Sequence, residues 1–352
     1  MKPLQLIVTT SILLCVVVVL GVLFFVSDHI EYKDTEPAAV ISPTATELEK
    51  SKPLETMVFL GDIMLGRHVE VLGTRHGTSY LTEKIRAQTA TSTHVIANFE
   101  SAMNEPHIPT VSGGMRFSTK ASMLPVLTEL RVTHASLANN HALDYGVSGY
   151  KNTIEQLKSK DITPFGHPTL LSSSSITYLE HNEQTIALIG IHTLFVEPTK
   201  GAIETVLAEA SQNSDFQIIY VHWGNEYELV HSQRQATLAS VMVESGADLI
   251  VGHHPHVTQD IQFINDVLVF YSLGNFIFDQ YFSTDVKEGY ILDVTLTNST
   301  STIKILPHTQ IGKSQTEPMQ GIQKSDYLES LADRSDPRLS DQIKAGNIAI
   351  TR

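Results

Sequence analysis

The sequence predicts an α/β fold in which short buried strands alternate with helices. Apolar runs rich in Val and Ile recur along the chain and end abruptly at glycine or polar residues, which is typical of buried strands. Segments with helical spacing lie between several of these runs. The chain has 352 residues, 42% of them hydrophobic, so it can build one large α/β domain or two smaller ones around a sizeable core.

The amino-terminal segment predicts a membrane anchor. Residues 4–26 contain no charged side chain and are long enough to cross a bilayer as a helix, preceded only by Lys2 and the amino terminus as positive charges. We expect residues 1–26 to be an uncleaved, single-pass transmembrane anchor, because the small residues of a cleavage site or of a lipid-attachment site before Cys15 are missing. Residues 27–54 are rich in Pro, Ser, Thr and Glu without a regular period, which predicts an extracytoplasmic linker.

Composition restricts the chemistry of the exported part. Without Lys2 the chain carries 23 Lys and Arg (24 minus 1) against 38 Asp and Glu, a formal net charge of −15 with neutral histidine. Such a surface argues against nucleic acid as a partner, and an anionic substrate would need a cation in its site. Cys15 is the only cysteine and lies in the predicted anchor, so any metal must be held by nitrogen and oxygen ligands.

The remaining elements follow from local apolar periodicity. Strands are predicted at residues 57–60, 95–97, 135–138, 184–190, 216–221, 249–251 and 267–271. Helices are predicted at residues 121–130, 149–158, 203–210 and 233–245. Residues 289–297 and 302–305 are expected to be edge strands. Residues 312–352 are polar and lack a strong period, so we expect a peripheral carboxy-terminal tail.

Polar side chains follow five of the predicted strands directly. They are Asp62, Glu100, Asn140 with His141, His222, and His254 with His256. Parallel strands with helical crossovers bring their carboxyl ends to one edge of a fold, so a shared site is expected there. Oxygen ligands together with imidazoles suit Mn, Zn, Fe or Mg. The alternative is that each histidine is satisfied separately and each acid caps a turn.

These strand ends resemble the motif series of a known family. The motifs are Gly61-Asp62, Asn98-Phe-Glu100, Asn139-Asn140-His141, His222-Trp-Gly224, Gly252-His-His-Pro-His256 and Ser272-Leu-Gly-Asn275. In this order they are similar to CapA-type poly-γ-glutamate capsule synthesis proteins, which resemble calcineurin-like metallophosphoesterases. The resemblance covers a domain of residues 55–311. It implies a four-layer sandwich of two central β-sheets flanked by helices, with two divalent metal ions at the strand ends.

The resemblance also implies roles for individual residues. The implied metal ligands are Asp62, Glu100, Asn140, His222, His254 and His256, with Glu100 bridging the two ions. His141 corresponds to the proton donor for the leaving oxygen, and Asp144 is expected to orient it. Candidate substrate-binding residues are Arg67, Asn98, His253 and Asn275.

Two departures from the metallophosphoesterase pattern concern the metal ligands. Met64 stands where an additional histidine ligand is expected, and a thioether is a poor ligand for a hard divalent ion, so the Asp62 site should be the weaker one. Glu100 stands where aspartate is usual, which leaves the spacing of the two ions open.

Three functions remain open from the sequence. The first is an outward-facing, metal-dependent phosphoesterase of capsule biosynthesis or cell-envelope metabolism, in the cell membrane. The second is an accessory subunit that binds or exports an anionic polymer together with capsule synthase or export proteins. The third is a peptidase acting on γ-glutamyl or peptidoglycan bonds, for which Glu226, four residues after His222, is the candidate base. Inference from a shared fold is analogy, so all three are kept.

Overall fold

The computed structural model describes residues 55–111, 113–297 and 300–351. The predicted anchor, residues 1–26, and the predicted linker, residues 27–54, lie outside the described residues. Among the described helices, none combines the length and the apolar character that crossing a membrane requires.

The first of two sheets, sheet A, carries the amino-terminal strands. Its strand order is β14-β13-β12-β1-β2-β3-β4, with β11 pairing to β1 and β15 to β13. The strands are β1 (Met57–Ile63), β2 (His94–Phe99), β3 (His134–Ser136), β4 (Thr163–Phe165), β11 (Asn275–Ile277), β12 (Glu288–Leu296), β13 (Thr300–Ile311), β14 (Gln315–Pro318) and β15 (Asn347–Thr351). Strands β1 to β4 run parallel, so their carboxyl ends share one edge, whereas β12 is antiparallel to β1.

The second sheet, sheet B, has the order β5-β6-β7-β8-β10-β9. Its strands are β5 (Ile176–His181), β6 (Gln184–His192), β7 (Phe216–His222), β8 (Leu249–His253), β9 (Ile261–Ile264) and β10 (Val267–Phe270). The four central strands β6, β7, β8 and β10 are parallel. Their carboxyl ends therefore also meet at one edge of the sheet.

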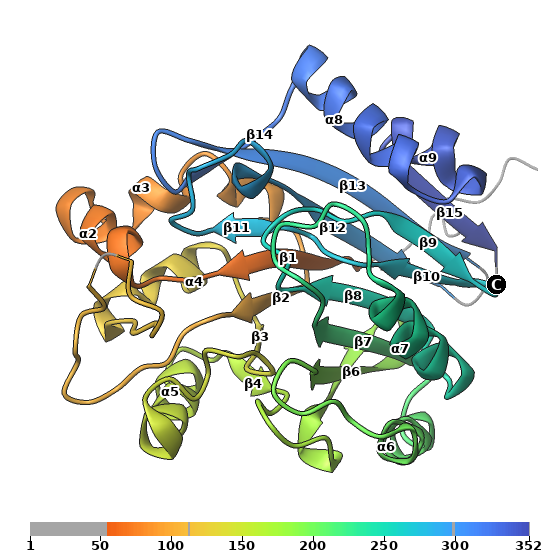
Figure 1. Cartoon of the computed structure of the whole chain (residues 1–352), viewed down its shortest axis with the longest axis horizontal. Helices are drawn as coiled ribbons and strands as arrows, with labels where there is room; N and C mark the ends of the chain where they lie inside the picture. The colour runs from red at the N-terminus through yellow and green to blue at the C-terminus, as the bar shows by residue number, and fades with distance from the viewer. Residues whose placement is uncertain (1–54, 112, 298–299, 352) are drawn as a thin grey trace, which may run out of the picture. The chain divides into compact units, whose positions relative to one another are not determined.

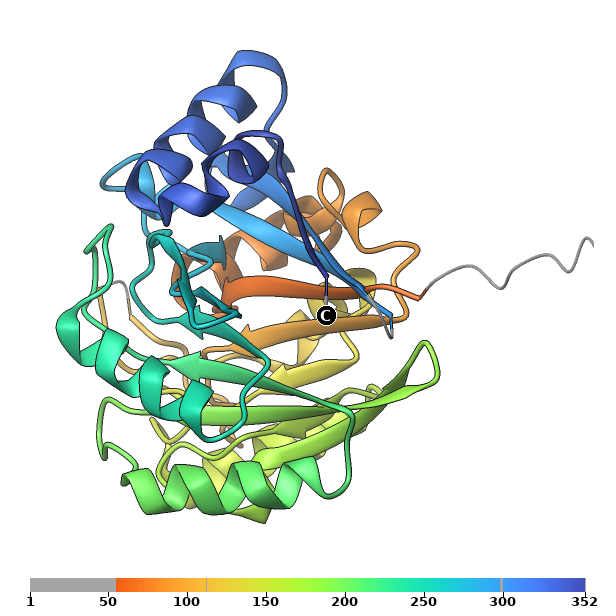
Figure 2. The same ribbon diagram turned by 90° about the vertical axis from the view of Figure 1, so that its right-hand side faces the viewer.

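Helices α2 to α7 cover the outer faces of the two sheets, and α8 and α9 lie on the other face of β12 and β13 (Figures 1 and 2). The helices are α2 (Arg67–His76), α3 (Ser79–Thr82), α4 (Pro125–Glu129), α5 (Gly146–Lys158), α6 (Lys200–Ser211), α7 (Gln233–Glu244), α8 (Gly321–Arg334) and α9 (Ser340–Lys344). Buried side chains of α2 to α5 pack on sheet A, and those of α6 and α7 pack on sheet B. Helices α8 and α9 pack on the inner face of β12 and β13. The expectation of two central sheets flanked by helices is confirmed.

Strand β1 illustrates how the layers arise. Alternate side chains of a strand point to opposite faces. Val58 and Leu60 therefore join the core under α2 to α5, whereas Met57 and Phe59 join the core between the two sheets. All four are fully buried, which explains why β1 reads as a continuous apolar run.

The carboxy-terminal part of the chain, from β12 onward, differs from the prediction. Strands β12 and β13 were expected at a sheet edge, but β12 lies between β1 and β13, and β13 pairs with β12, β14 and β15. Residues 315–351 form β14, α8, α9 and β15 in place of a peripheral tail. Leu328, Leu331 and Ile343 are buried in the core against sheet A. Local periodicity is weak here because the burial comes from partners distant in the sequence.

Candidate metal centre

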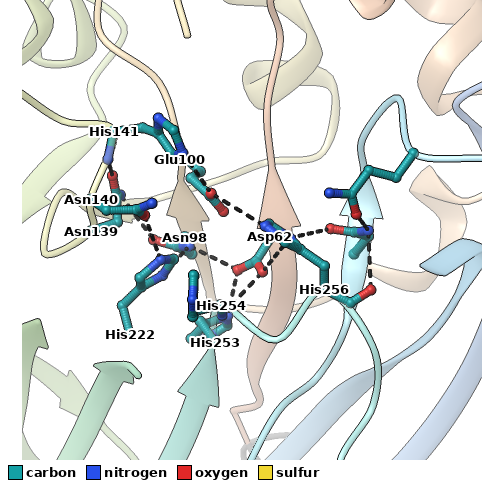
Figure 3. Close-up of polar contacts among 12 residues, drawn as sticks. Asp62, Asn98, Glu100, Asn139, Asn140, His141, His222, His253, His254 and His256 are labelled. Carbon is teal, nitrogen blue, oxygen red and sulfur yellow. Dashed lines mark hydrogen bonds and ion pairs between the residues drawn. The ribbon is translucent and has the colours of Figure 1, made fainter. Parts of the chain in front are cut away.

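The polar residues predicted at strand ends converge on one site between the edges of the two sheets (Figure 3). Asp62 lies in β1, Asn98 and Glu100 lie in and just after β2, and the segment 139–141 follows β3. From sheet B, His222 ends β7 and His253 ends β8, with His254 and His256 in the next loop. The ring centroids of His222 and His254 are 4.9 Å apart, and those of His254 and His256 are 5.7 Å apart. The predicted convergence is therefore present.

Asp62 joins the two sheets at the centre of the site. Its Oδ1 accepts hydrogen bonds from Nδ2 of Asn98 at 2.8 Å and from Nδ1 of His253 at 3.1 Å. Its Oδ2 accepts the backbone N–H of His254 at 3.2 Å and lies 3.5 Å from Nδ1 of His256. Burial alone would raise the pKa of Asp62, but the hydrogen bonds and charges of His253 and His256 hold this pKa well below its usual range. The carboxylate is thus anionic and fixed.

Glu100 is the buried carboxylate that the surrounding protein does not satisfy. Its side chain is fully buried, and neither carboxylate oxygen has a hydrogen-bond partner among the described residues. Nε2 of His141 and Nε2 of His256 each lie 3.7 Å from Oε1, too far for a hydrogen bond. Burial raises the pKa of Glu100 well above its usual value, although the charge of His256 opposes this. An unsatisfied buried carboxylate indicates a missing cationic partner.

His222 and Asn140 place two potential metal-ligand atoms side by side. Nε2 of His222 lies 2.8 Å from Oδ1 of Asn140, and Nδ1 of the same ring lies 3.1 Å from Nδ2 of Asn98. Asn139 in turn donates from Nδ2 to Oδ1 of Asn98 at 3.1 Å. Burial, followed by the charge of His254, lowers the pKa of His222 well below its usual value. The ring is therefore neutral, as a metal ligand must be.

The loop after β8 holds His254 and His256 in unusual backbone conformations. Both have positive φ, 98° and 58°, on either side of Pro255. This region is costly for residues with a Cβ, and such strain concentrates at functional sites. Burial, followed by the charge of His256, lowers the pKa of His254 to about 3. Burial also lowers the pKa of His256, but the charges of Glu100 and Asp62 outweigh it and raise this pKa to about 9.

His141 stands at the mouth of the site with its ring fixed from two sides. Its Nδ1 pairs with Oδ2 of Asp144 at 2.7 Å, and its ring stacks on Phe117 with centroids 3.7 Å apart. Asp144 Oδ2 also accepts the backbone N–H of Phe117 at 2.5 Å. Because Nδ1 faces Asp144, Nε2 is the nitrogen that faces Glu100 and the cavity. The carboxylate is therefore placed to orient the imidazole.

A cavity of about 780 Å³ opens at this mouth. His141, His256, Glu226 and Arg67 are among its lining residues. The guanidinium of Arg67 pairs with Asp279 and lies 4.4 Å from the ring centroid of Phe117, so its position is fixed. Of the predicted substrate-binding residues, Arg67 therefore reaches the cavity.

The other three predicted substrate-binding residues lie behind the ligands. Asn98, His253 and Asn275 are buried, with exposures of 0%, 1% and 0%. Asn98 and His253 hydrogen-bond to Asp62, and Oδ1 of Asn275 lies 2.9 Å from Nδ1 of His256. This last contact leaves Nε2 of His256 as the atom directed at Glu100. The placement of these residues favours orienting the ligands over touching a substrate.

Met64 takes no part in the site. Its side chain is fully buried in the core under α2 to α5, and its sulfur accepts the backbone N–H of Gly66 at 3.0 Å. Two groups of potential ligands remain, each with donor atoms within 4.8 Å of one another. They are Asp62, Glu100 and His256, and Glu226, His254 and His256. Glu226 is thus a further candidate ligand.

Two residues of the site, His192 and Glu226, are not among the ligands that the sequence predicts. His192 ends β6 in direct register with His222, and the two ring centroids are 5.8 Å apart. The signal was available, because His192 follows the run 184–190 as His222 follows the run 216–221. The sequence offers Glu226 only as a candidate base, because no local pattern indicates that its side chain reaches His254 and His256.

The residues present fit a divalent metal. The potential ligands are imidazoles, carboxylates and an amide oxygen, and the buried Glu100 carboxylate has no hydrogen-bond partner among the described residues. His254 and His222 are held neutral by burial. The contacts of Asn275 and Asp144 orient imidazole rings, as expected around metals. Fold and geometry together define an α/β protein of two packed sheets with a candidate metal centre at their strand ends.

Comparison with known proteins identifies the family. The family described as "Bacterial capsule synthesis protein PGA_cap" matches residues 56–280. The chain is 34% identical over 277 residues to "Capsule biosynthesis protein CapA" of Bacillus anthracis, covering 72% of this chain and 66% of that protein. It is 32% identical over 265 residues to "PGA biosynthesis protein CapA" of Bacillus subtilis (strain 168), covering 71% and 70%. The chain belongs to the bacterial capsule synthesis protein PGA_cap family.

The chain thus spans about two thirds of the length of these two relatives. Among solved structures, a hypothetical protein from Thermus thermophilus matches with a TM-score of 0.43 and 15% identity, covering 75% of this chain and 98% of that one. This likeness is too low to support an argument about function.

Proposed function

We propose that this capsule biosynthesis protein hydrolyses a phosphoester with two divalent metal ions, anchored in the cell membrane by residues 1–26 and facing outward. The observation that carries the proposal is the fully buried Glu100 carboxylate, which has no hydrogen-bond partner among the described residues and lies close to potential metal ligands from both sheets. Asp62, Asn140, His222, His254 and His256 would supply the other ligands. Glu226 is a further candidate, and we expect the Asp62 site to bind its ion more weakly.

The metal ions, His141 and Arg67 would have different roles in this reaction. When bound, the metal ions would polarise the phosphoryl oxygens and supply a water of lowered pKa. His141 faces the cavity through Nε2, the atom that would give a proton to the leaving oxygen, and Asp144 at 2.7 Å holds the ring in that orientation. Arg67 stands at the cavity as a fixed cation, suited to an anionic group of the substrate.

A second function is a non-catalytic role in handling an anionic polymer with synthase or export proteins. The cavity supports this second function, because two basic residues, Arg67 and Lys313, are among its lining residues. A relative from Mycobacterium tuberculosis, 23% identical over 181 residues, carries the name "Probable polyglutamine synthesis accessory protein Rv0574c". A metal-dependent peptidase is a third candidate, supported by Glu226 beside His254 and His256.

Substrate panels on the full-length protein in detergent, loaded with Mn²⁺ or Zn²⁺, separate these functions. The panel contains phosphomonoesters, phosphodiesters and γ-glutamyl peptides. We expect phosphoester hydrolysis that a chelator abolishes and that His222→Asn lowers at least ~100-fold, whereas the exposed-site control His76→Gln retains full activity. A fully metallated protein that cleaves no phosphoester would refute the hydrolase proposal. Cleavage of γ-glutamyl peptides alone would favour the peptidase.

The membrane placement has its own test. A carboxy-terminal tag on the full-length protein should be removed by protease added to intact cells after the cell wall is stripped. A tag that is cleaved only after the membrane is permeabilised would contradict the outward orientation.

A further inference from the structure

A separate group of potential metal ligands, Glu55, His94 and His181, lies at the opposite end of the parallel strands. His94 opens β2 and His134 opens β3, whereas Glu55 lies two residues before β1. His181 ends β5, at the turn that leads into β6 of sheet B. The candidate metal centre, in contrast, lies at the carboxyl ends of β1 and β2. Met57 is the register partner of His94, five residues before Asp62, and this distance corresponds to about 17 Å along an extended strand.

The donor atoms of this group are close enough to share one ion. One ligand atom each of Glu55, His94 and His181 lies within 4.8 Å of the other two. The ring centroid of His94 is 6.3 Å from that of His181 and 5.8 Å from that of His134. Since a Zn–N bond is about 2.0–2.1 Å, shifts of about 1 Å would bring three ligands onto one ion. One carboxylate and two or three imidazoles form a typical ligand set for zinc.

Hydrogen bonds fix the orientation of the imidazoles. Nε2 of His94 donates to the carbonyl oxygen of Glu180 at 2.7 Å, which leaves Nδ1 with its lone pair. A metal-binding histidine characteristically gives its other N–H to a backbone carbonyl in this manner. Nδ1 of His134 lies 2.9 Å from Oγ1 of Thr133, which leaves Nε2 of His134.

Asn182 fixes Glu55 beside His181. Its side-chain oxygen accepts the backbone N–H of Glu55 at 2.7 Å, and its own backbone N–H donates to Oε2 of Glu55 at 3.1 Å. Nδ2 of Asn182 reaches the carbonyl oxygens of Glu55 and Leu296, both at 3.1 Å, so its two protons have acceptors. The same Nδ2 is 3.1 Å from Nε2 of His181, and the backbone N–H of Leu296 donates to that nitrogen at 3.4 Å, so Nε2 carries the lone pair of this ring.

We propose that Glu55, His94 and His181 bind a structural transition-metal ion of the Zn²⁺ class, with His134 or water as the fourth ligand. The ion would connect the starts of β1 and β2 in sheet A to the β5–β6 turn of sheet B. It would thereby tie the two sheets together at the end remote from the candidate metal centre. The two sites share no residue, so this proposal and the proposed function stand or fall separately.

Zinc binding to the full-length protein in detergent tests the proposal. The test uses a background in which Glu100→Gln and His222→Asn together disable the candidate metal centre. After chelation, this background should bind one Zn²⁺ per chain in elemental analysis, and Co²⁺ in its place should give the intense visible absorption of a tetrahedral nitrogen–oxygen site. Adding Glu55→Gln or His94→Gln should weaken zinc binding at least ~10-fold in a chelator competition. Adding His76→Gln, on the exposed end of α2, should not change it.

The outcomes are decisive in both directions. Two results would overturn the proposal. The first is that the background protein and its Glu55→Gln and His94→Gln variants bind zinc with equal affinity. The second is that the background protein binds no zinc and shows no Co²⁺ absorption. The cluster would then be held by hydrogen bonds alone. Glu55 and His94 are only half-buried, so their glutamine variants should fold, and circular dichroism verifies this. The Co²⁺ spectrum of the background needs neither variant.

Discussion

Oδ1 of Asp62 and Nδ1 of His253 lie 3.1 Å apart, although Asp62 belongs to β1 of sheet A and His253 to β8 of sheet B. The candidate metal centre is therefore assembled across the interface of two sheets. Its geometry depends on the packing that holds those sheets in place, and Tyr220 contributes to this packing. The Tyr220 hydroxyl donates to the carbonyl oxygen of Leu60 at 2.9 Å, and its ring centroid is 4.1 Å from that of His253.

Tyr220→Phe should destabilise the fold. The substitution leaves the buried carbonyl oxygen of Leu60 without its donor, so we expect the free energy of unfolding to fall by about 1–2 kcal/mol. Urea unfolding of the metal-free protein measures it. Tyr178→Phe is the matched control, because Tyr178 on β5 is 40% exposed, and it should change the free energy by less than about 0.5 kcal/mol. Equal values for both variants would disprove the inter-sheet role of Tyr220.

Glu100→Gln should separate stability from metal binding. Without metal, the variant should be at least as stable as the parent, because it replaces a buried carboxylate that has no hydrogen-bond partner among the described residues. With metal at 100 times its dissociation constant, the parent should gain about 2.7 kcal/mol, and the variant should lose most of this gain. Thermal unfolding with and without Mn²⁺ or Zn²⁺ measures both effects. A variant that gains as much as the parent would remove Glu100 from the ligand set.

His141→Asn should affect catalysis and spare the metal. We expect hydrolysis of a phosphoester with a poor leaving group to fall about 10²–10⁴-fold, while the metal content stays that of the parent. Asp144→Asn should cause a smaller loss, because it weakens the orientation of the ring at 2.7 Å without removing it. A fall in metal content that parallels the fall in rate would instead make His141 a ligand.

Glu226→Gln should lower metal affinity with little effect on the fold. Glu226 is exposed, and its ligand atom lies within 4.8 Å of those of His254 and His256. We expect metal affinity at one of the two positions to fall about 10–100-fold, while the unfolding free energy of the metal-free protein stays within about 0.5 kcal/mol. Isothermal titration of the metal-free protein measures the affinity, with exposed Glu244→Gln as control. Unchanged binding would remove Glu226 from the ligand set.

His308 should make stability depend on acidic pH. Burial lowers the pKa of His308 to about 3, against 6.5 in the unfolded chain. Between these values the unfolded state binds a proton that the folded state does not, so stability is present above pH 6.5 and is lost as the pH falls toward 3. His308 alone should contribute up to about 1.4 kcal/mol per pH unit to the slope of the unfolding free energy against pH.

His308→Leu should flatten that part of the profile, because leucine does not titrate. Urea unfolding at several pH values between 4 and 7, on metal-free protein, compares the two slopes. Identical slopes would show that His308 contributes nothing to acid sensitivity.

Much of the site was predictable because its residues occupy one recurring local position. Asp62, Glu100, His222 and His254 each follow an apolar run, and parallel strands bring such positions to a common edge. The same reasoning applies to His192, because the predicted strand 184–190 ends two residues before it. The anchor prediction concerns residues 1–26, outside the described residues, and stays a prediction.

The sequence by itself determined the α/β class, the main strands, the family motifs and the convergence of ligands, because apolar periodicity and strand ends are local properties. Only the tertiary structure decided which strands belong to each sheet, the burial of residues 315–351 in the core, and the positions of Asn98, His253 and Asn275 behind the ligands. It also brought Glu226 to His254 and His256, and His181 to His94. These relationships join segments distant in the chain, and their energies come from side-chain packing between the layers, which no local pattern records.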